Sequence, residues 1–142
     1  MARADLSIVT LGVRDLPRSV RFYEALGWER ASSSLDEISW FRTPHSYLGL
    51  FGYEELAEDA KLPTGTRPPF GGITLAVNVS SREEADAFYD VALAAGARVL
   101  RRPEEMSWGG YSGYFADPDD YPWEVAHNPS FAIGDDGRMV IP

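Results

Sequence analysis

The sequence predicts a mixed α+β protein made of two copies of one structural module. Short motifs recur in the same order, 64 to 69 residues apart. The matching pairs are residues 9–13 with 73–77, Phe22 and Tyr23 with Phe88 and Tyr89, and Gly27 with Gly96. Each copy also has the pattern of a strand, a helix that ends near a glycine, and further strands. Duplication explains three ordered matches better than chance, and the chain has room for two copies only.

The first copy, residues 4–56, is expected to open with a strand over residues 6–13, where β-branched and apolar residues dominate. A helix follows, with Asp15 as its N-cap, Pro17 in its first turn and Gly27 at its end. Three side chains at helical spacing are expected to face the sheet: Val20, Tyr23 and Leu26.

Two further strands, residues 37–43 and 46–53, are expected on either side of a turn at Pro44 and His45. Residues 57–69 are predicted to link the two copies, because prolines and glycines interrupt this stretch and the residues just after it.

The second copy, residues 70–129, is expected to repeat the pattern, starting with a strand over residues 73–79. Ser81 and Glu84 form a capping-box pattern at the start of the next helix, and Gly96 ends it. The expected buried side of this helix consists of Ala85, Phe88, Tyr89 and Ala92.

The rest of the second copy has shorter elements. They are a strand over 98–101, a glycine-rich loop over 106–113, strands over 114–116 and 123–127, and a turn over 117–120 between these two strands. The tail, residues 130–142, has a possible hairpin with its turn at residues 135–137.

The composition narrows the class of protein. The chain is 44% hydrophobic, too apolar for a disordered protein, and no apolar run approaches the ~20 residues that span a bilayer. Residues 1–6 contain no apolar stretch typical of a signal peptide, so a cytoplasmic protein is expected. A net charge of −9 argues against nucleic acid and membrane surfaces as partners. The absence of cysteine excludes disulfides, thiolate nucleophiles and cysteine-ligated metals.

Three stretches carry a resemblance to a known superfamily: VTLGVRDL at residues 9–16, FYEALGW at 22–28 and GYFADPDDYPWEV at 113–125. With them the chain resembles the vicinal oxygen chelate superfamily, which includes glyoxalase I, extradiol dioxygenases and bleomycin-resistance proteins. The resemblance implies two βαβββ modules whose sheets form an open half-barrel cup, the glyoxalase/bleomycin-resistance fold, and a homodimer. Asp120 departs from the pattern, which usually has glycine there.

The resemblance also implies four metal-ligand positions, one on each of four strands that line the cup. They correspond to Ile8, Gly49, Gly72 and Glu124. Only Glu124 has a side chain that binds a metal. His45 lies in a predicted turn, and His127 follows Glu124 by three residues, an odd spacing that places the two on opposite faces of a strand. No metal and no other cofactor is therefore expected.

Alternation along the strands, counted from those ligand positions, predicts the lining of the cup. The expected ligand-binding residues are Trp40, Tyr47, Phe51, Thr74, Asn78, Trp108, Ser112 and Tyr114. The two tryptophans are expected at the rim, whereas Phe115 is expected to pack under the helices. Aromatic walls with a few polar groups are typical of a small-molecule pocket. Each aromatic residue has an alternative interpretation as part of the core.

Glu124 is the predicted catalytic or ligand-binding carboxylate, acting as a general base or as an acceptor for an amine of the ligand. The alternative is a buried carboxylate that tyrosine or serine hydroxyls hold without any function. The glycines at positions 49 and 72 have two interpretations as well: they permit close strand packing, or they widen the cup for a bulky ligand.

Three functions are compatible with the sequence. The favoured one is a metal-free binding protein of the bleomycin-resistance kind that sequesters a flat or cationic small molecule, because the net charge favours a cation. The alternative is a lyase, isomerase or dioxygenase-like enzyme that uses Glu124 as a base or a relocated metal. The third is a structural module without a ligand. A hydrolase is disfavoured, because two histidines so placed form no nucleophile constellation.

Overall fold

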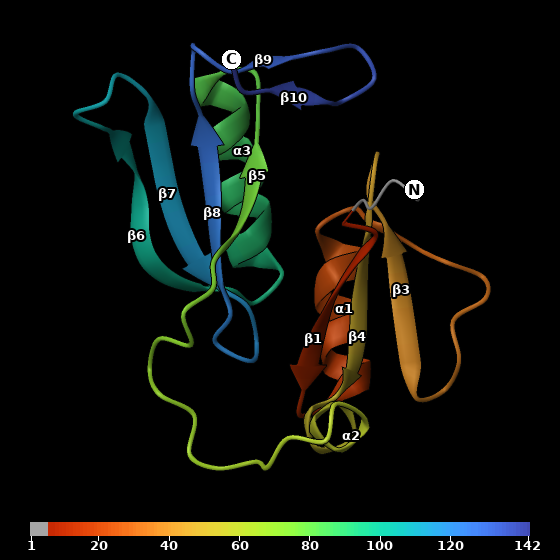
Figure 1. Ribbon diagram of the computed structural model, residues 1–142. Helices are drawn as coiled ribbons and strands as arrows, with labels where there is room; N and C mark the ends of the chain where they lie inside the picture. Colours follow the sequence, from red (N-terminus) through yellow and green to blue (C-terminus); the bar gives the residue numbers. More distant parts are fainter. Residues whose placement is uncertain (1–5) are drawn as a thin grey trace. The chain divides into compact units, whose positions relative to one another are not determined.

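The computed structural model describes residues 6–142, which divide into two compact units with the boundary between Thr66 and Arg67 (Figure 1). The boundary falls within the predicted linker. Residues 4 and 5, where the first module was predicted to begin, lie outside the described residues, as does most of the N-terminal stretch that lacks a signal-peptide pattern. None of the helices in the described part of the chain is long and apolar enough to cross a membrane.

Unit 1 contains a four-stranded sheet with helices packed against it (Figure 1). Its elements are β1 (Ile8–Val13), α1 (Leu16–Ala25), β2 (Glu29–Arg30), β3 (Ile38–Arg42), β4 (Tyr47–Gly52) and α2 (Tyr53–Asp59). Helix α1 packs against β3 and β4, while α2 contacts β1 and β4. The strand order is β1-β4-β3-β2, with β1 parallel to β4 and the other neighbours antiparallel.

Unit 2 repeats this topology, which confirms the predicted α+β class and the two βαβββ modules. Its elements are β5 (Leu75–Asn78), α3 (Arg82–Ala94), β6 (Arg98–Glu105), β7 (Tyr111–Ala116), β8 (Pro122–His127), β9 (Ala132–Ile133) and β10 (Met139–Val140). The main sheet has the order β5-β8-β7-β6, the same pattern as unit 1, and β5 is parallel to β8. The last two strands form a small antiparallel hairpin. The joining of the two main sheets into one cup stays a prediction.

Local signals predicted the first helix well. The Asp15 side chain accepts a hydrogen bond from the main-chain nitrogen of Arg18 (3.1 Å), which is the expected N-cap. Gly27 follows the helix with a φ of 96°, in the left-handed region that glycine tolerates. The buried side differs slightly from the prediction, since Phe22 is buried whereas Val20 is only half-buried.

The core of unit 2 lies between α3 and the sheet. Phe115 stacks on Trp123 at a centroid distance of 6.5 Å and meets Tyr89 of the helix edge-on at 6.1 Å. Phe115 is fully buried, as predicted. Ser81 is the N-cap of this helix, and its hydroxyl accepts from the Glu84 nitrogen (3.1 Å), as in the predicted capping box.

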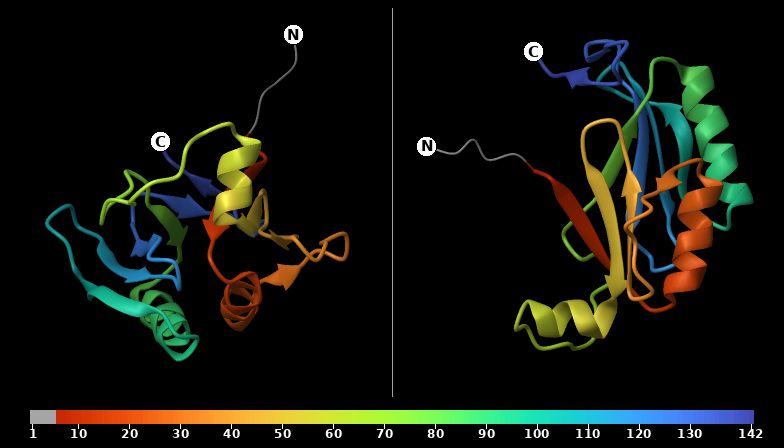
Figure 2. Two further views of the ribbon diagram at one scale, coloured as in Figure 1. Left: turned by 90° about the horizontal axis from the view of Figure 1, so that it is seen from below. Right: turned by 90° about the vertical axis from the view of Figure 1, so that its right-hand side faces the viewer.

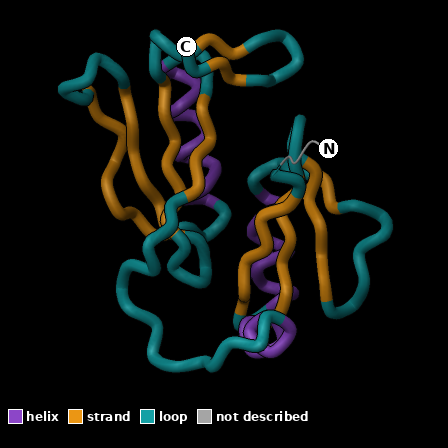
Figure 3. The backbone as a smooth tube through the Cα atoms, in the orientation of Figure 1, coloured by secondary structure: helices purple, strands orange, loops and turns teal. Residues whose placement is uncertain are grey.

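The structure corrects three element boundaries. Helix α2 occupies residues that the sequence predicts as the end of a strand and as part of the linker. A loop then connects α2 to β5 (Figure 3). Strand β6 continues through Pro103 to Glu105, and β7 begins at Tyr111 instead of Tyr114. Pro103 is tolerated because β6 is an edge strand with two register shifts, where a missing N–H costs no ladder hydrogen bond.

The turn between β7 and β8 explains the departure at Asp120. The Asp117 carboxylate accepts from the nitrogens of Asp119 (2.8 Å) and Tyr121 (2.9 Å) and so shapes the turn. Asp120 has a φ of 67°, the left-handed region that favours glycine. The exposed Asp120 side chain pairs with Arg98 at 2.9 Å. The unusual residue is therefore accommodated without any change in the strand pairing.

Candidate functional site

The candidate site lies on the face of the unit 2 sheet that is opposite α3. Figure 2 shows the helix lying against one side of this sheet. The register pairs Tyr114 with Glu124 and Ser112 with Ala126, while Phe115 and Trp123 point to the helix. We call the helix-free side the open face of unit 2. It is formed by Ala76, Arg101, Ser112, Tyr114, Glu124 and Ala126.

A short hydrogen bond joins the two polar residues at the centre of the open face. The Ser112 hydroxyl donates to Glu124 Oε2 over 2.6 Å. Ser112 is fully buried, whereas Glu124 is half-buried. The other carboxylate oxygen, Oε1, makes no hydrogen bond to any of the described residues. Within residues 6–142, Glu124 therefore has one oxygen that accepts from Ser112 and one that is available as an acceptor.

Arg101 is the residue of this face that the sequence analysis missed. Its Nη2 donates to the Ser112 hydroxyl (3.2 Å), and its Nη1 donates to the Ser112 carbonyl (2.7 Å). The guanidinium lies over the Tyr114 ring, 5.5 Å from the centroid. Glu104 forms an ion pair with it at 3.3 Å. The positive charge of Arg101 is thus offset by Glu104, which leaves Glu124 as the excess negative charge of the cluster.

No sequence pattern distinguished Arg101 from its neighbour Arg102. Strand alternation assigns faces only while the register is continuous. Strand β6 has register shifts between Val99 and Arg101 and again between Arg101 and Glu104. Because each shift adds a residue without a partner, alternation along β6 cannot be counted from either end.

The remaining predicted residues of unit 2 lie at the two ends of β5 and in the loop between β6 and β7. Thr74 precedes β5 and is exposed, and Asn78 is the half-buried last residue of that strand. Trp108 lies in the loop between β6 and β7, half-exposed, with its indole ring over Gly110. Neither Thr74, Asn78 nor Trp108 makes a side-chain hydrogen bond to Glu124.

His127 is separated from Glu124, as the odd spacing predicts. The β7–β8 register runs without a shift from residue 122 to residue 127, so the two side chains point to opposite faces. His127 Nδ1 lies 3.2 Å from the Val79 carbonyl oxygen. The histidine therefore has a structural contact and does not join the carboxylate.

Two tyrosine hydroxyls form hydrogen bonds between β7 and α3. The Tyr89 hydroxyl donates to the main-chain oxygen of Tyr114 (2.9 Å), and burial raises the pKa of Tyr89. The Tyr111 hydroxyl donates to Asp86 (2.7 Å), and this hydrogen bond raises the pKa of Tyr111. Both hydroxyls are therefore protonated at neutral pH and act as donors.

The three predicted ligand-binding residues of unit 1 lie on the face of its sheet opposite α1. Trp40 pairs with Gly49 across β3 and β4, and Tyr47 and Phe51 alternate with buried leucines on β4. A Cβ atom at Gly49 would lie 2.9 Å from Thr10 Oγ1. A larger residue here would require the Thr10 side chain to move, which favours the close-packing interpretation of Gly49.

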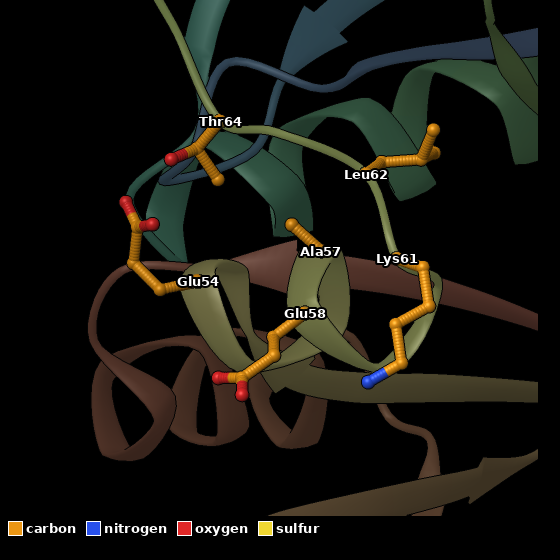
Figure 4. Close-up of a pocket in the computed structure, with 6 residues that line it drawn as sticks. All are labelled: Glu54, Ala57, Glu58, Lys61, Leu62 and Thr64. Atoms are coloured by element: carbon orange, nitrogen blue, oxygen red, sulfur yellow. The ribbon is translucent and has the colours of Figure 1, made fainter.

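One hollow in unit 1 lies away from these residues. It encloses about 330 Å³ beside α2 and the segment after it (Figure 4). The residues that line it are Glu54, Ala57, Glu58, Lys61, Leu62 and Thr64. It is open to solvent, and none of the predicted ligand-binding residues contributes to it.

The residues at the implied metal positions do not fit a metal. Ile8, Gly49 and Gly72 have no donor atom in their side chains, and Glu124 already shares one oxygen with Ser112. Within the described residues of either unit, no three His, Asp or Glu side chains come together in a group that would hold a metal ion. Through Glu124, the open face of unit 2 can accept a hydrogen bond, attract a positively charged group or take up a proton.

Comparison with known proteins gives a consistent result. The model of one family, the glyoxalase/bleomycin resistance protein/dioxygenase superfamily, matches residues 6–125. A glyoxalase-related enzyme from Fulvimarina pelagi is 35% identical, with a TM-score of 0.87 over 96% of this chain and 97% of that one. A glyoxalase/bleomycin resistance protein/dioxygenase family enzyme from Burkholderia phytofirmans PsJN is 25% identical, with a TM-score of 0.76 over 87% and 98% of the two chains.

A more distant structure shares the fold. The lactoylglutathione lyase from Agrobacterium tumefaciens is 21% identical, with a TM-score of 0.68 over 89% of this chain and 96% of that one. No curated protein matches the sequence.

Proposed function

The chain belongs to the glyoxalase/bleomycin resistance protein/dioxygenase superfamily, and from this membership we propose that it is a metal-free protein that binds flat, cationic small molecules. The proposed site is the open face of unit 2, with Glu124 as its main polar determinant and Tyr114 as an aromatic wall. We propose that Trp108 provides further aromatic surface for the same ligand, while Trp40, Tyr47 and Phe51 stay predicted ligand-binding residues of unit 1.

The single observation that carries the proposal is the burial and hydrogen bonding of the Glu124 carboxylate. The carboxylate is half-buried on an open sheet face, one oxygen accepts from Ser112 and the other has no partner in the described chain. A carboxylate that is partly removed from water is costly unless a partner offsets it. A cationic group of a ligand supplies that partner, and the aromatic rings nearby favour a flat one.

The charge around the site supports a cation over an anion. Arg101 pairs with Glu104, so the local cluster retains the negative charge of Glu124. The whole chain has a net charge of −9, which attracts cations from a distance and repels anions.

The binding of a matched pair of dyes tests the proposal. N-methylacridinium and acridine have the same flat ring system, but in mildly alkaline buffer only the former is charged. We expect the wild-type protein to bind the cation more tightly, as measured by fluorescence titration. Glu124→Gln keeps the shape and removes the charge, so it should weaken cation binding by about 1–4 kcal/mol, the range of the attraction between two unit charges roughly 4 Å apart in water and near a protein surface.

Two controls make the result specific. Acridine affinity should be the same for the wild type and Glu124→Gln, because the neutral ring does not use the carboxylate. Glu83→Gln removes an exposed carboxylate of α3 and should leave both affinities unchanged. Equal binding of the cation by the wild type and Glu124→Gln would reject Glu124 as the determinant.

An enzyme with Glu124 as a general base is the second candidate, favoured by the 35% identity to a glyoxalase-related enzyme. The Agrobacterium relative is a lactoylglutathione lyase, so formation or loss of lactoylglutathione, followed by its thioester absorbance, is the first activity to assay. If the chain is such an enzyme, Glu124→Gln should abolish turnover while substrate binding persists.

A further inference from the structure

We infer that Arg101 is a positioning residue: it fixes the direction of the Ser112 hydroxyl, and through it the orientation of Glu124. The inference deepens the proposed function and rests on Glu124 being its main polar determinant. It starts from the contact sequence Arg101 Nη2, Ser112 Oγ, Glu124 Oε2, with distances of 3.2 Å and 2.6 Å. We call these three residues the relay.

Donor and acceptor chemistry gives the relay one direction only. A guanidinium donates and never accepts, so the Ser112 oxygen must accept from Arg101. An ionised carboxylate accepts and never donates, so the single Ser112 hydrogen must go to Glu124. Ser112 is fully buried, so with both partners in place no water reaches its hydroxyl.

Arg101 is itself held firmly enough to act as the fixed end. Its Nη1 donates to the Ser112 carbonyl at 2.7 Å while Nη2 reaches the hydroxyl of the same residue. The two terminal nitrogens of the planar guanidinium thus donate to two oxygens of one residue. Glu104 at 3.3 Å, the Met106 sulfur at 3.2 Å and the Tyr114 ring under the guanidinium also surround it.

Because Arg101 donates to two oxygens of Ser112, we expect lysine not to replace it fully. A lysine retains the charge, but its single ammonium group lacks the rigid fork that reaches both oxygens at once. Arg101→Lys therefore changes the hydrogen bonding of Ser112 while the net charge of the site stays the same. With Ser112 less constrained, Glu124 must be ordered when the ligand binds, which lowers affinity.

A double-mutant cycle on the ligand-free protein tests the relay directly. The readout is the Glu124 side-chain carboxyl carbon resonance in the NMR spectrum of the carbon-13-labelled protein. We expect Arg101→Lys to move this resonance toward its position in Ser112→Ala. We expect the double variant to match Ser112→Ala alone, because without the hydroxyl Arg101 has no path to Glu124.

Arg102→Lys is the matched control, since Arg102 is the exposed neighbour on the same strand. It should leave the Glu124 resonance unchanged. If Arg101→Lys leaves the resonance at the wild-type position, or moves it equally with and without the Ser112 hydroxyl, the relay is wrong. Because lysine preserves the charge and most of the side-chain volume, the variant is expected to fold.

The dye titration then separates the two proposals. N-methylacridinium affinity should fall about threefold to tenfold in Arg101→Lys and should not fall further when Ser112→Ala is already present. Coupling in the NMR cycle without binding of N-methylacridinium would reject the proposed function and keep the relay. Glu124-dependent dye binding with additive NMR shifts would reject the relay and keep the proposed function.

Discussion

At the scale of single residues, Gly113 and Pro103 show how closely β6 and β7 approach beneath the site. A Cβ atom at Gly113 would lie 2.6 Å from the Pro103 nitrogen and 2.9 Å from the Arg101 carbonyl oxygen, too close for any real side chain. Gly113→Ala should therefore push β6 away and destabilise the protein by about 1–3 kcal/mol, as overpacking does. Urea denaturation measures this change in the free energy of unfolding.

Gly71→Ala is the control for that measurement. A Cβ atom there meets nothing within 4 Å, and Gly71 does not have a positive φ. Its replacement should be neutral or stabilise by about 0.4–1 kcal/mol, because alanine restricts the unfolded chain. A Gly113→Ala variant as stable as Gly71→Ala would contradict the close approach of the two strands.

The residues of the site differ in how far the sequence predicted them. Glu124 came from a family motif, and Ser112 and Tyr114 came from counting alternate positions along neighbouring strands; the register confirms that all three share a face. Arg101 could not be found in this way, because its side is set by two bulges that depend on the partner strand.

At the scale of elements, Tyr111 links β7 to α3 through Asp86 and provides a pH-dependent contribution to stability. The hydrogen bond to Asp86 and then burial raise the pKa of Tyr111 above its usual value of 10.0. A raised pKa means that the folded state favours the protonated hydroxyl. The stabilisation is therefore complete below pH 10.0 and is lost as the pH rises through the folded-state pKa.

Tyr111→Phe removes this contribution. We expect the variant to lose less stability than the wild type as the pH rises above 10.0, as measured by urea denaturation across an alkaline series. Tyr89, whose pKa burial raises, gives a remaining alkaline loss of the same sign in both proteins. Tyr47→Phe is the control, because the Tyr47 hydroxyl makes no hydrogen bond to the described residues. A pH dependence identical in the wild type and Tyr111→Phe would contradict the role of the Asp86 hydrogen bond.

Elements with strong local signals were predicted well, and those that depend on neighbours were not. The caps at Asp15 and Ser81 mark the starts of α1 and α3 in the sequence itself. The continuation of β6 through Pro103 depends on its place at the sheet edge, which only the folded sheet defines. Helix α2 begins at Tyr53 directly after a strand and has no side-chain cap, so no capping residue in the sequence predicts its start.

At the scale of the whole molecule, the repeat in the sequence corresponds to a repeat in topology. Both main sheets have the same strand order, with an edge strand at each side of an open sheet. Edge strands and apolar side chains at the surface, such as Val99 and Leu100 on β6, favour association with a second copy.

We therefore expect a homodimer, as the family resemblance also implies. Sedimentation equilibrium at micromolar concentration should give twice the chain mass of 15.7 kDa. A stable species of 15.7 kDa under these conditions would show that the chain is a monomer.

The net charge of the chain favours weak binding of metal ions, whereas the residues at the four implied metal-ligand positions disfavour specific binding. A net charge of −9 attracts divalent cations weakly and without specificity. Specific binding needs several donors, but Ile8, Gly49 and Gly72 supply none, and the Thr10 side chain approaches the place of a Cβ atom at Gly49 to 2.9 Å. We expect dialysed protein to hold well under one equivalent of nickel, zinc, iron or manganese by elemental mass spectrometry. One equivalent that survives dialysis and disappears in Glu124→Gln would show that other residues complete a metal site around this carboxylate.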